Sequence, residues 1–139
     1  DEFKKFNDRF GHKAGDLVLK LVAMQCKSSL RDVDIFGRLG GEEFVVALPD
    51  TDLEHAVMVA DRLRKVVEEA NLTEAENLFD LVTSDMSKKD ALRVTVSVGV
   101  ATCDESCKNI DMVIDHADRA MYSVKYTGRN RINVWNNGV

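Results

Sequence analysis

The residues of this chain best suited to chemistry are two glycines followed at once by two carboxylates, Gly40-Gly41-Glu42-Glu43. Glycine adopts the positive φ that a tight turn needs, and it lets a bound group approach the backbone N–H donors without meeting a Cβ. Glutamate supplies the hard oxygen ligands that Mg²⁺ uses beside nucleotide phosphates. The stretch therefore predicts a phosphate and metal site, although the same residues would also suit a plain exposed turn with solubilising acids.

A hairpin is the element expected to position these groups. The glycine pair lies between two apolar runs, Ile35–Phe36 and Phe44–Leu48, whose β-branched and aromatic residues are typical of strands. Gly-Gly between such runs is a strong hairpin signal, and it places the two acids at the tip. Pro49, the only proline, is expected to end the second strand.

Three stretches with helical spacing of apolar residues predict helices over about 14–29, over about 52–69, and from Ile110 until Gly128 ends the last one. The segment Thr51-Asp52-Leu53-Glu54 has the spacing of a capping box at the start of the second helix. Residues 1–13 are interpreted as polar and irregular.

Two further strands are expected near the C-terminus. Valines alternate with smaller residues from Val94 to Val100, which predicts a strand with one buried face. Residues 131–135 follow the last helix and predict a final strand. Between them and the second helix, residues 71–89 are interpreted as an acidic surface excursion in which Thr73 could begin a short helix. The order of these helices and strands along the chain predicts an α/β sandwich with mixed strands.

The composition limits the classes of protein that fit. With 139 residues, 45% of them hydrophobic, the chain is expected to form one globular domain with a real core. Its net charge of −5 argues against binding to a nucleic acid polymer. No apolar run has the length of a membrane span, and the charged start is unlike a signal peptide. The cysteines Cys26, Cys103 and Cys107 are interpreted as reduced thiols, with a Cys103–Cys107 disulfide or metal pair as a minor alternative.

Several spaced motifs together make the chain resemble the GGDEF domain of diguanylate cyclases. They occur in the family's order and run almost end to end, which is far more specific than one glycine pair. The motifs are D-x-F-K-x-x-N-D at residues 1–8, G-H-x-x-G-D at 11–16, G-G-E-E-F at 40–44, T-V-S-V-G-V at 95–100, and Lys125 with Gly128-Arg129-Asn130.

The resemblance implies a palm-like, ferredoxin-related mixed sheet flanked by helices, which is the nucleotidyl cyclase-like fold. It implies a single GGDEF domain over residues 1–139. In the family, a strand precedes the first motif and carries a metal-binding aspartate two residues upstream of the position of Asp1. The sequence begins after that strand, so the domain is expected to be N-terminally truncated relative to the family.

The activity implied by the resemblance is condensation of two GTP into cyclic di-GMP and two pyrophosphates, with Mg²⁺ or Mn²⁺ as the metal. Glu42 matches a metal ligand, and Glu43 matches the second catalytic acid. Asn7 and Asp16 match the guanine-reading positions, where an amide meets the carbonyl and ring edge of guanine and a carboxylate accepts from its N1–H and amine. The full set implied to contact GTP is Phe3, Lys4, Asn7, Asp16, Gly40, Gly41, Lys125 and Arg129. Lys125 and Arg129 are also spaced one helical turn apart, which predicts that they face one anion together.

A second site is implied by Arg31-x-x-Asp34, which ends five residues before the glycine pair. It matches the inhibitory site at which GGDEF domains bind cyclic di-GMP, and Arg62 matches the auxiliary arginine of that site. The family works as a homodimer through facing active sites, which need form only transiently. The alternative to a cyclase is a catalytically silent GGDEF module that binds GTP or cyclic di-GMP and mediates dimerisation or signalling. The domain is expected in the cytoplasm without membrane contact, in a parent protein that could be membrane-anchored.

Overall fold

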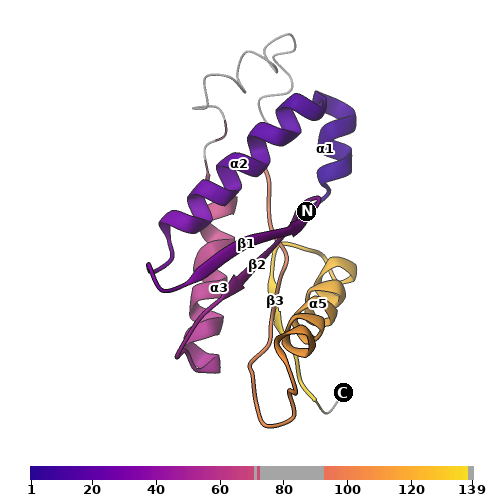
Figure 1. Cartoon of the computed structure of the whole chain (residues 1–139). Helices are drawn as coiled ribbons and strands as arrows, with labels where there is room; N and C mark the ends of the chain where they lie inside the picture. The colour runs from indigo at the N-terminus through magenta and orange to yellow at the C-terminus, as the bar shows by residue number, and fades with distance from the viewer. Residues whose placement is uncertain (71, 73–92, 138–139) are drawn as a thin grey trace. The chain divides into compact units, whose positions relative to one another are not determined.

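The computed structural model describes residues 1–70, 72 and 93–137 of the chain (Figure 1). The chain forms two compact units. The hairpin unit comprises Glu2–Ala47 and Val66–Val94, and the C-terminal unit comprises Asp1, Leu48–Lys65 and Thr95–Val139. The predicted short helix after Thr73 falls on residues outside the described ranges, as does nearly all of the predicted excursion.

The helices and strands follow the predicted order, with one helix more at the start. They are α1 (Phe3–Phe10), α2 (His12–Ser28), β1 (Ile35–Gly40), β2 (Glu43–Ala47), α3 (Leu53–Glu68), β3 (Val98–Val100), α5 (Ile110–Tyr126) and β4 (Ile132–Val134). The hairpin and the helices α3 and α5 are confirmed close to their predicted bounds. Among the described residues, no helix has the length and apolar character needed to cross a membrane.

The expectation that residues 1–13 are irregular is wrong, because α1 occupies most of them. Phe6 and Phe10 lie one helical turn apart with their ring centroids 4.7 Å from each other, and only 8% of Phe6 is exposed. Gly11, with a φ of 90°, ends α1 by donating its N–H to the Asn7 carbonyl at 2.7 Å. The second helix then begins at His12, two residues earlier than predicted.

The hairpin β1–β2 is antiparallel, as the glycine pair predicted. Arg38 pairs with Phe44, and the register becomes irregular between Arg38 and Gly40 as the chain enters the turn. The rings of Phe36 and Phe44 stack at 5.3 Å and stabilise the strand pair on one face. The strand β2 ends at Ala47, before Pro49 is reached.

In the C-terminal unit, β3 pairs with β4 in parallel, with Val98 opposite Ile132 and Val100 opposite Val134. Figure 1 shows α5 beside this pair. Gly99 makes the close approach possible, because a Cβ added there would lie only 1.8 Å from the Ala117 carbonyl oxygen of α5. The core of the unit is apolar and comprises Ala56, Ala60 and Val100, packed against Leu48, Val57, Val98, Ile132 and Val134.

The prediction of one strand over residues 94–100 is too long. Ladder pairing with β4 begins at Val98, while Thr95 and Ser97 donate their hydroxyls to the carboxylate of Asp1 at 2.8 and 2.7 Å. The final strand is likewise shorter than predicted and covers Ile132–Val134. In the described residues, the strands form two separate two-stranded sheets, one antiparallel and one parallel, so both strand orientations of the predicted mixed sheet occur.

The predicted capping box at Thr51 is wrong by one residue. Asp52 is the cap, because its Oδ1 accepts the His55 backbone N–H at 2.9 Å, whereas the Thr51 hydroxyl donates to the Pro49 carbonyl. The hydrogen bonds from the backbone and side chain of His55 lower the pKa of Asp52. The helix α3 therefore begins at Leu53.

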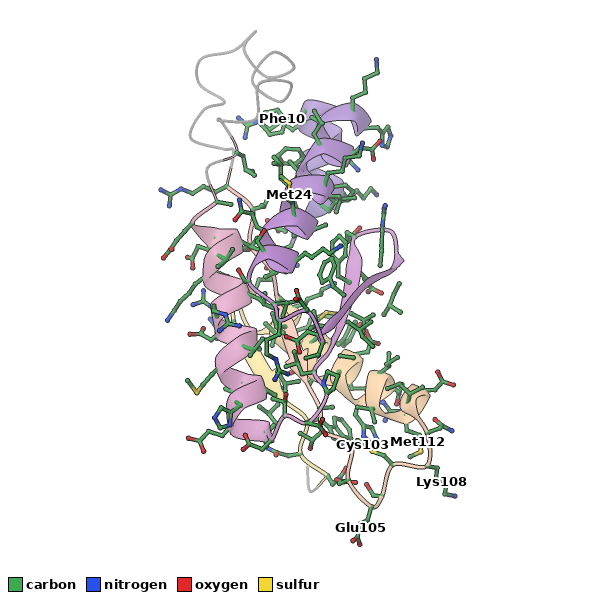
Figure 2. The ribbon with its side chains drawn as sticks, turned by 60° about the vertical axis from the view of Figure 1, so that its left-hand side comes forward. Phe10, Met24, Cys103, Glu105, Lys108 and Met112 are labelled. Carbon is green, nitrogen blue, oxygen red and sulfur yellow. The ribbon has the colours of Figure 1, made fainter. Side chains whose placement is uncertain are left out.

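The three cysteines are free thiols in different surroundings. Cys26 is buried in α2, and burial raises the pKa of its thiol to about 11. Cys103 and Cys107 belong to the loop that leads into α5, on which Figure 2 labels Cys103, Glu105 and Lys108. Cys107 donates its S–H weakly to the Thr102 carbonyl at 3.8 Å.

Candidate active site

The tip of the hairpin is open to a ligand. Gly40 and Gly41 have φ angles of 155° and 53°, and a Cβ placed on either would have no atom within 4 Å. The guanidinium of Arg38 donates to the Gly41 carbonyl, with its Nε at 2.8 Å. This bond ties the turn to β1. Glu42 and Glu43 follow the turn directly, and both are exposed.

The acidic residues of the tip fit a nucleotide-bound magnesium ion better than a protein-only metal site. Among the described residues, no three His, Cys, Asp or Glu side chains gather into a set that could hold a metal ion by themselves. Mg²⁺, however, commonly uses only one or two protein carboxylates and takes its remaining ligands from phosphates and water. The donor chemistry of Glu42 and Glu43 therefore fits Mg²⁺ in the company of a nucleotide.

Asn7 is the most unusual polar residue of the hairpin unit. Its side-chain Oδ1 is buried and has no hydrogen-bond partner, the one such side-chain atom found in the described residues. The oxygen lies against Gly15 of α2, where an added Cβ would stand 1.7 Å from Oδ1 and 3.0 Å from the ring of Phe3. Buried polar atoms are nearly always hydrogen-bonded, so this acceptor is suited to a donor that comes from a ligand.

Asp16 and Lys4 lie on the same two helices as this acceptor. Asp16 is exposed in the first turns of α2, one residue after Gly15, and Lys4 is exposed on α1, one turn before Asn7. The two helices thus carry an amide oxygen, a carboxylate and an ammonium group. These are an acceptor pair for base N–H groups and a cation for phosphate.

The predicted pairing of Lys125 and Arg129 on one helical face is wrong. The helix α5 ends at Tyr126, and Gly128, Arg129 and Asn130 all have positive φ angles, so Arg129 lies on a turn beyond the helix. Its backbone N–H donates to the Val124 carbonyl at 3.0 Å, which closes the helix end. Arg129 is exposed and Lys125 is half-buried.

The Arg31-x-x-Asp34 pair is formed within the hairpin unit. The Arg31 guanidinium contacts Asp34 Oδ1 at 2.8 Å, and the Arg31 backbone N–H donates to Oδ2 at 2.8 Å. Only 1% of the Asp34 side chain is exposed, against 54% for Arg31, so the carboxylate holds the guanidinium at the surface. Arg62 is exposed on α3 in the C-terminal unit.

The remaining predicted positions are divided between the two units. The hairpin unit carries the hairpin tip, Asn7, Asp16, Lys4 and Phe3, and the C-terminal unit carries Lys125 and Arg129. Sequence reasoning gave no role to Gly15, although glycine inside a helix is a signal of close packing. It also gave none to Arg64, whose guanidinium donates to the Asn130 side chain at 3.1 Å.

Comparison with known proteins identifies the class to which this fold and site belong. The family described as "Diguanylate cyclase, GGDEF domain" matches residues 1–131. The chain therefore belongs to the GGDEF family. Its mixed helix and sheet arrangement is that of GGDEF domains of known structure, and the predicted nucleotidyl cyclase-like fold is confirmed.

Individual relatives agree with this assignment. Diguanylate cyclase A of Treponema denticola is 39% identical over the whole chain, which covers 34% of that protein. The active GGEEF domain of a diguanylate cyclase from Vibrio cholerae has a TM-score of 0.83 and 30% identity, with 99% of this chain and 79% of that chain covered. The GGDEF domain of DgcB from Caulobacter crescentus, in complex with c-di-GMP, has a TM-score of 0.80 and 30% identity, with 96% and 72% covered. The chain spans about a third of the length of the curated relatives that it matches.

Proposed function

We propose that this chain is the catalytic domain of a diguanylate cyclase, which condenses two GTP molecules into cyclic di-GMP and two pyrophosphates. The relatives named diguanylate cyclases support the reaction class. The unaltered Gly-Gly-Glu-Glu-Phe hairpin with an open tip supports an active member over a silent one.

The observation that carries the proposal is the unpartnered Oδ1 of Asn7 against Gly15. Guanine presents an N1–H and an exocyclic amine on one edge, and both are donors. The sequence predicts that Asp16 accepts from both donors and that the Asn7 amide contacts the carbonyl and ring edge of guanine. Because Asn7 Oδ1 is an unpartnered acceptor, Asn7 is proposed to share these donors with Asp16. Adenine lacks this pair of donors, so the same acceptors would leave an adenine unmatched.

The phosphates are proposed to lie at the hairpin tip. Backbone N–H groups of Gly40 and Gly41 would donate to them, and Lys4, Lys125 and Arg129 would neutralise their charge. Glu42 would hold Mg²⁺, or Mn²⁺ in its place, with Glu43 as the second acid. When bound, the metal supplies polarisation of the phosphate and a lower pKa for the attacking hydroxyl.

In each half-reaction, the 3′-oxygen of one GTP forms a bond to the α-phosphorus of the other. The bond from that phosphorus to the pyrophosphate oxygen breaks, and the 3′-hydroxyl proton leaves to a nearby base or water. Catalysis rests mainly on positioning and on stabilisation of the charge that develops. Two such steps close the ring and release two pyrophosphates.

A homodimer is required by this chemistry, because one domain binds one GTP. Twofold symmetry between facing domains would place each 3′-hydroxyl at the other nucleotide's α-phosphate. The dimer need last only for one catalytic cycle. Since GTP is the substrate, the cytoplasm is the proposed location.

Arg31, Asp34 and Arg62 are proposed as the site of product inhibition. The 2.8 Å pair between Arg31 and Asp34 supports this proposal, because it presents a preoriented guanidinium to a phosphate or guanine edge. The DgcB neighbour is described in complex with c-di-GMP. In the Arg31→Ala variant, turnover should continue while added cyclic di-GMP no longer inhibits. Unchanged inhibition would contradict the assignment.

The decisive experiment is conversion of GTP in the presence of Mg²⁺, with the product separated by chromatography, on the protein at its natural length. The Glu42→Ala variant should lose at least a hundredfold in turnover, because a metal ligand is removed. Glu105→Ala, on an exposed loop, is the matched control and should be unaffected. Product from neither the parent nor the control, with GTP or cyclic di-GMP still bound, would favour the silent binding module instead.

A further inference from the structure

The turn that carries Arg129 has an unusual backbone. Gly128, Arg129 and Asn130 have φ angles of 122°, 60° and 47°, so three successive residues adopt positive φ. Most residues with a Cβ rarely adopt this conformation, although asparagine does so more readily than arginine. Such a turn persists only when surrounding contacts hold it.

The first of these contacts comes from α3. The Arg64 guanidinium donates through Nη1 to the Asn130 Oδ1 at 3.1 Å, while its Nε contacts Asp61 at 3.0 Å. Only 14% of the Arg64 side chain is exposed. The Asp61 carboxylate therefore orients the planar guanidinium, which donates a hydrogen bond to the Asn130 side chain in the turn.

The second contact comes from Asp1. Its carboxylate accepts the Asn130 backbone N–H at 3.2 Å, in addition to the hydroxyls of Thr95 and Ser97. Asn130 is thus held by its side chain and by its backbone. Arg131, the next residue, accepts the Val98 N–H at 3.0 Å and joins the turn to β3.

The geometry points to Arg64 and Asp1 as positioning residues for Arg129. We propose that they hold Asn130 from two sides and so fix the left-handed turn that presents the Arg129 guanidinium to the triphosphate of GTP. This inference rests on the proposed function, in which Arg129 contacts phosphate. It adds that the orientation of Arg129 depends on two residues that need not touch the nucleotide.

A purely structural role for Arg64 would lower the stability of the protein without any dependence on Arg129. A positioning role would weaken nucleotide binding through Arg129 alone. A double-mutant cycle between Arg64 and Arg129 separates the two, because independent effects multiply and coupled effects do not.

The test uses the protein at its natural length, with two readouts: kcat and KM for GTP, and the affinity for a non-hydrolysable GTP analogue. Arg64→Lys keeps the charge but loses the planar fork that contacts Asp61 and Asn130 together. It should lower kcat/KM and analogue affinity about tenfold, with little change in melting temperature. Asp1→Asn should act in the same direction. Arg119→Lys is the control, because Arg119 also pairs with an aspartate of its own helix, Asp115 at 2.9 Å.

In the Arg129→Ala background, Arg64→Lys should have no further effect on either readout. Asn130→Gly is the second test variant, because glycine tolerates a φ of 47° yet removes the acceptor of Arg64, and it should reproduce the loss seen in Arg64→Lys. Multiplicative losses in the double variant would overturn the inference while leaving the proposed function intact. An Arg129→Ala variant with unchanged kinetics and analogue affinity would overturn the phosphate role of Arg129 and the inference with it.

Discussion

Replacement of Gly15 by alanine tests the guanine-reading role of Asn7 without touching a polar group. The added Cβ would stand 1.7 Å from Asn7 Oδ1 and 2.9 Å from its Cγ, whereas ordinary contact begins near 3.4 Å. The amide must therefore move by about 1.7 Å if it moves straight away from the helix. The added Cβ would also stand 3.0 Å from Cζ of Phe3, so that ring must shift as well.

The expected effect is large on kcat/KM for GTP and small on the stability of the fold. Displacement of a binding group by about 1 Å costs on the order of a hundredfold in efficiency, so kcat/KM for GTP should fall by about that factor. Alanine is favoured over glycine in a helix by about 1 kcal/mol, which offsets part of the cost of moving one flexible side chain. The melting temperature should therefore change by only a few degrees.

The assay measures kcat/KM for GTP and the affinity for GTP and ATP analogues, together with the melting temperature. The preference for guanine over adenine should shrink along with the GTP affinity. Gly37→Ala is the matched control, because its Cβ would meet only Val45 Cγ1 at an ordinary 3.8 Å. A Gly15→Ala protein that is stably folded and retains full guanine preference would refute the assignment of Asn7 as a base-reading residue.

Three further outcomes follow from the structure. Gly99→Ala should destabilise the protein by about 3 kcal/mol, measured by denaturant unfolding, because its Cβ would press into the backbone of α5 at 1.8 Å; unchanged stability would contradict the close packing of β3 on α5. Iodoacetamide at pH 8 should modify Cys103 in the folded protein and Cys26 only after unfolding, because burial raises the pKa of Cys26 to about 11. Equal modification rates of the two cysteines, measured by mass spectrometry, would argue against that burial. His55 lowers the pKa of Asp52, so the stabilisation of α3 by Asp52 should be present above the ordinary carboxyl pKa near 4 and lost as the pH falls through the lowered value. Asp52→Ala should therefore reduce the drop in melting temperature between pH 5 and pH 3. An unaltered drop would count against the cap.

Local sequence signals predicted the helices and strands that short-range interactions specify. A glycine pair between apolar runs is enough to specify a hairpin, and long periodic stretches are enough to specify α3 and α5. The first helix was missed because it is only eight residues long and Glu2, which precedes it, offers no side-chain cap. What stabilises it is burial of Phe6, a tertiary contribution that periodicity over two turns does not reveal.

The sequence by itself determined the family, because the chemistry of the ligand requires particular residue types and these occur as motifs in a fixed order. The tertiary structure decided how those residues are held. Asn130 forms hydrogen bonds with Arg64 and Asp1, which lie 66 and 129 positions away in the sequence, and no local spacing predicts these contacts. The same applies to the unpartnered oxygen of Asn7, which is buried only because Gly15 allows the two helices to approach. Residue types follow from the chemistry of the ligand, whereas their orientation follows from packing between distant segments, and only the folded chain brings those segments together.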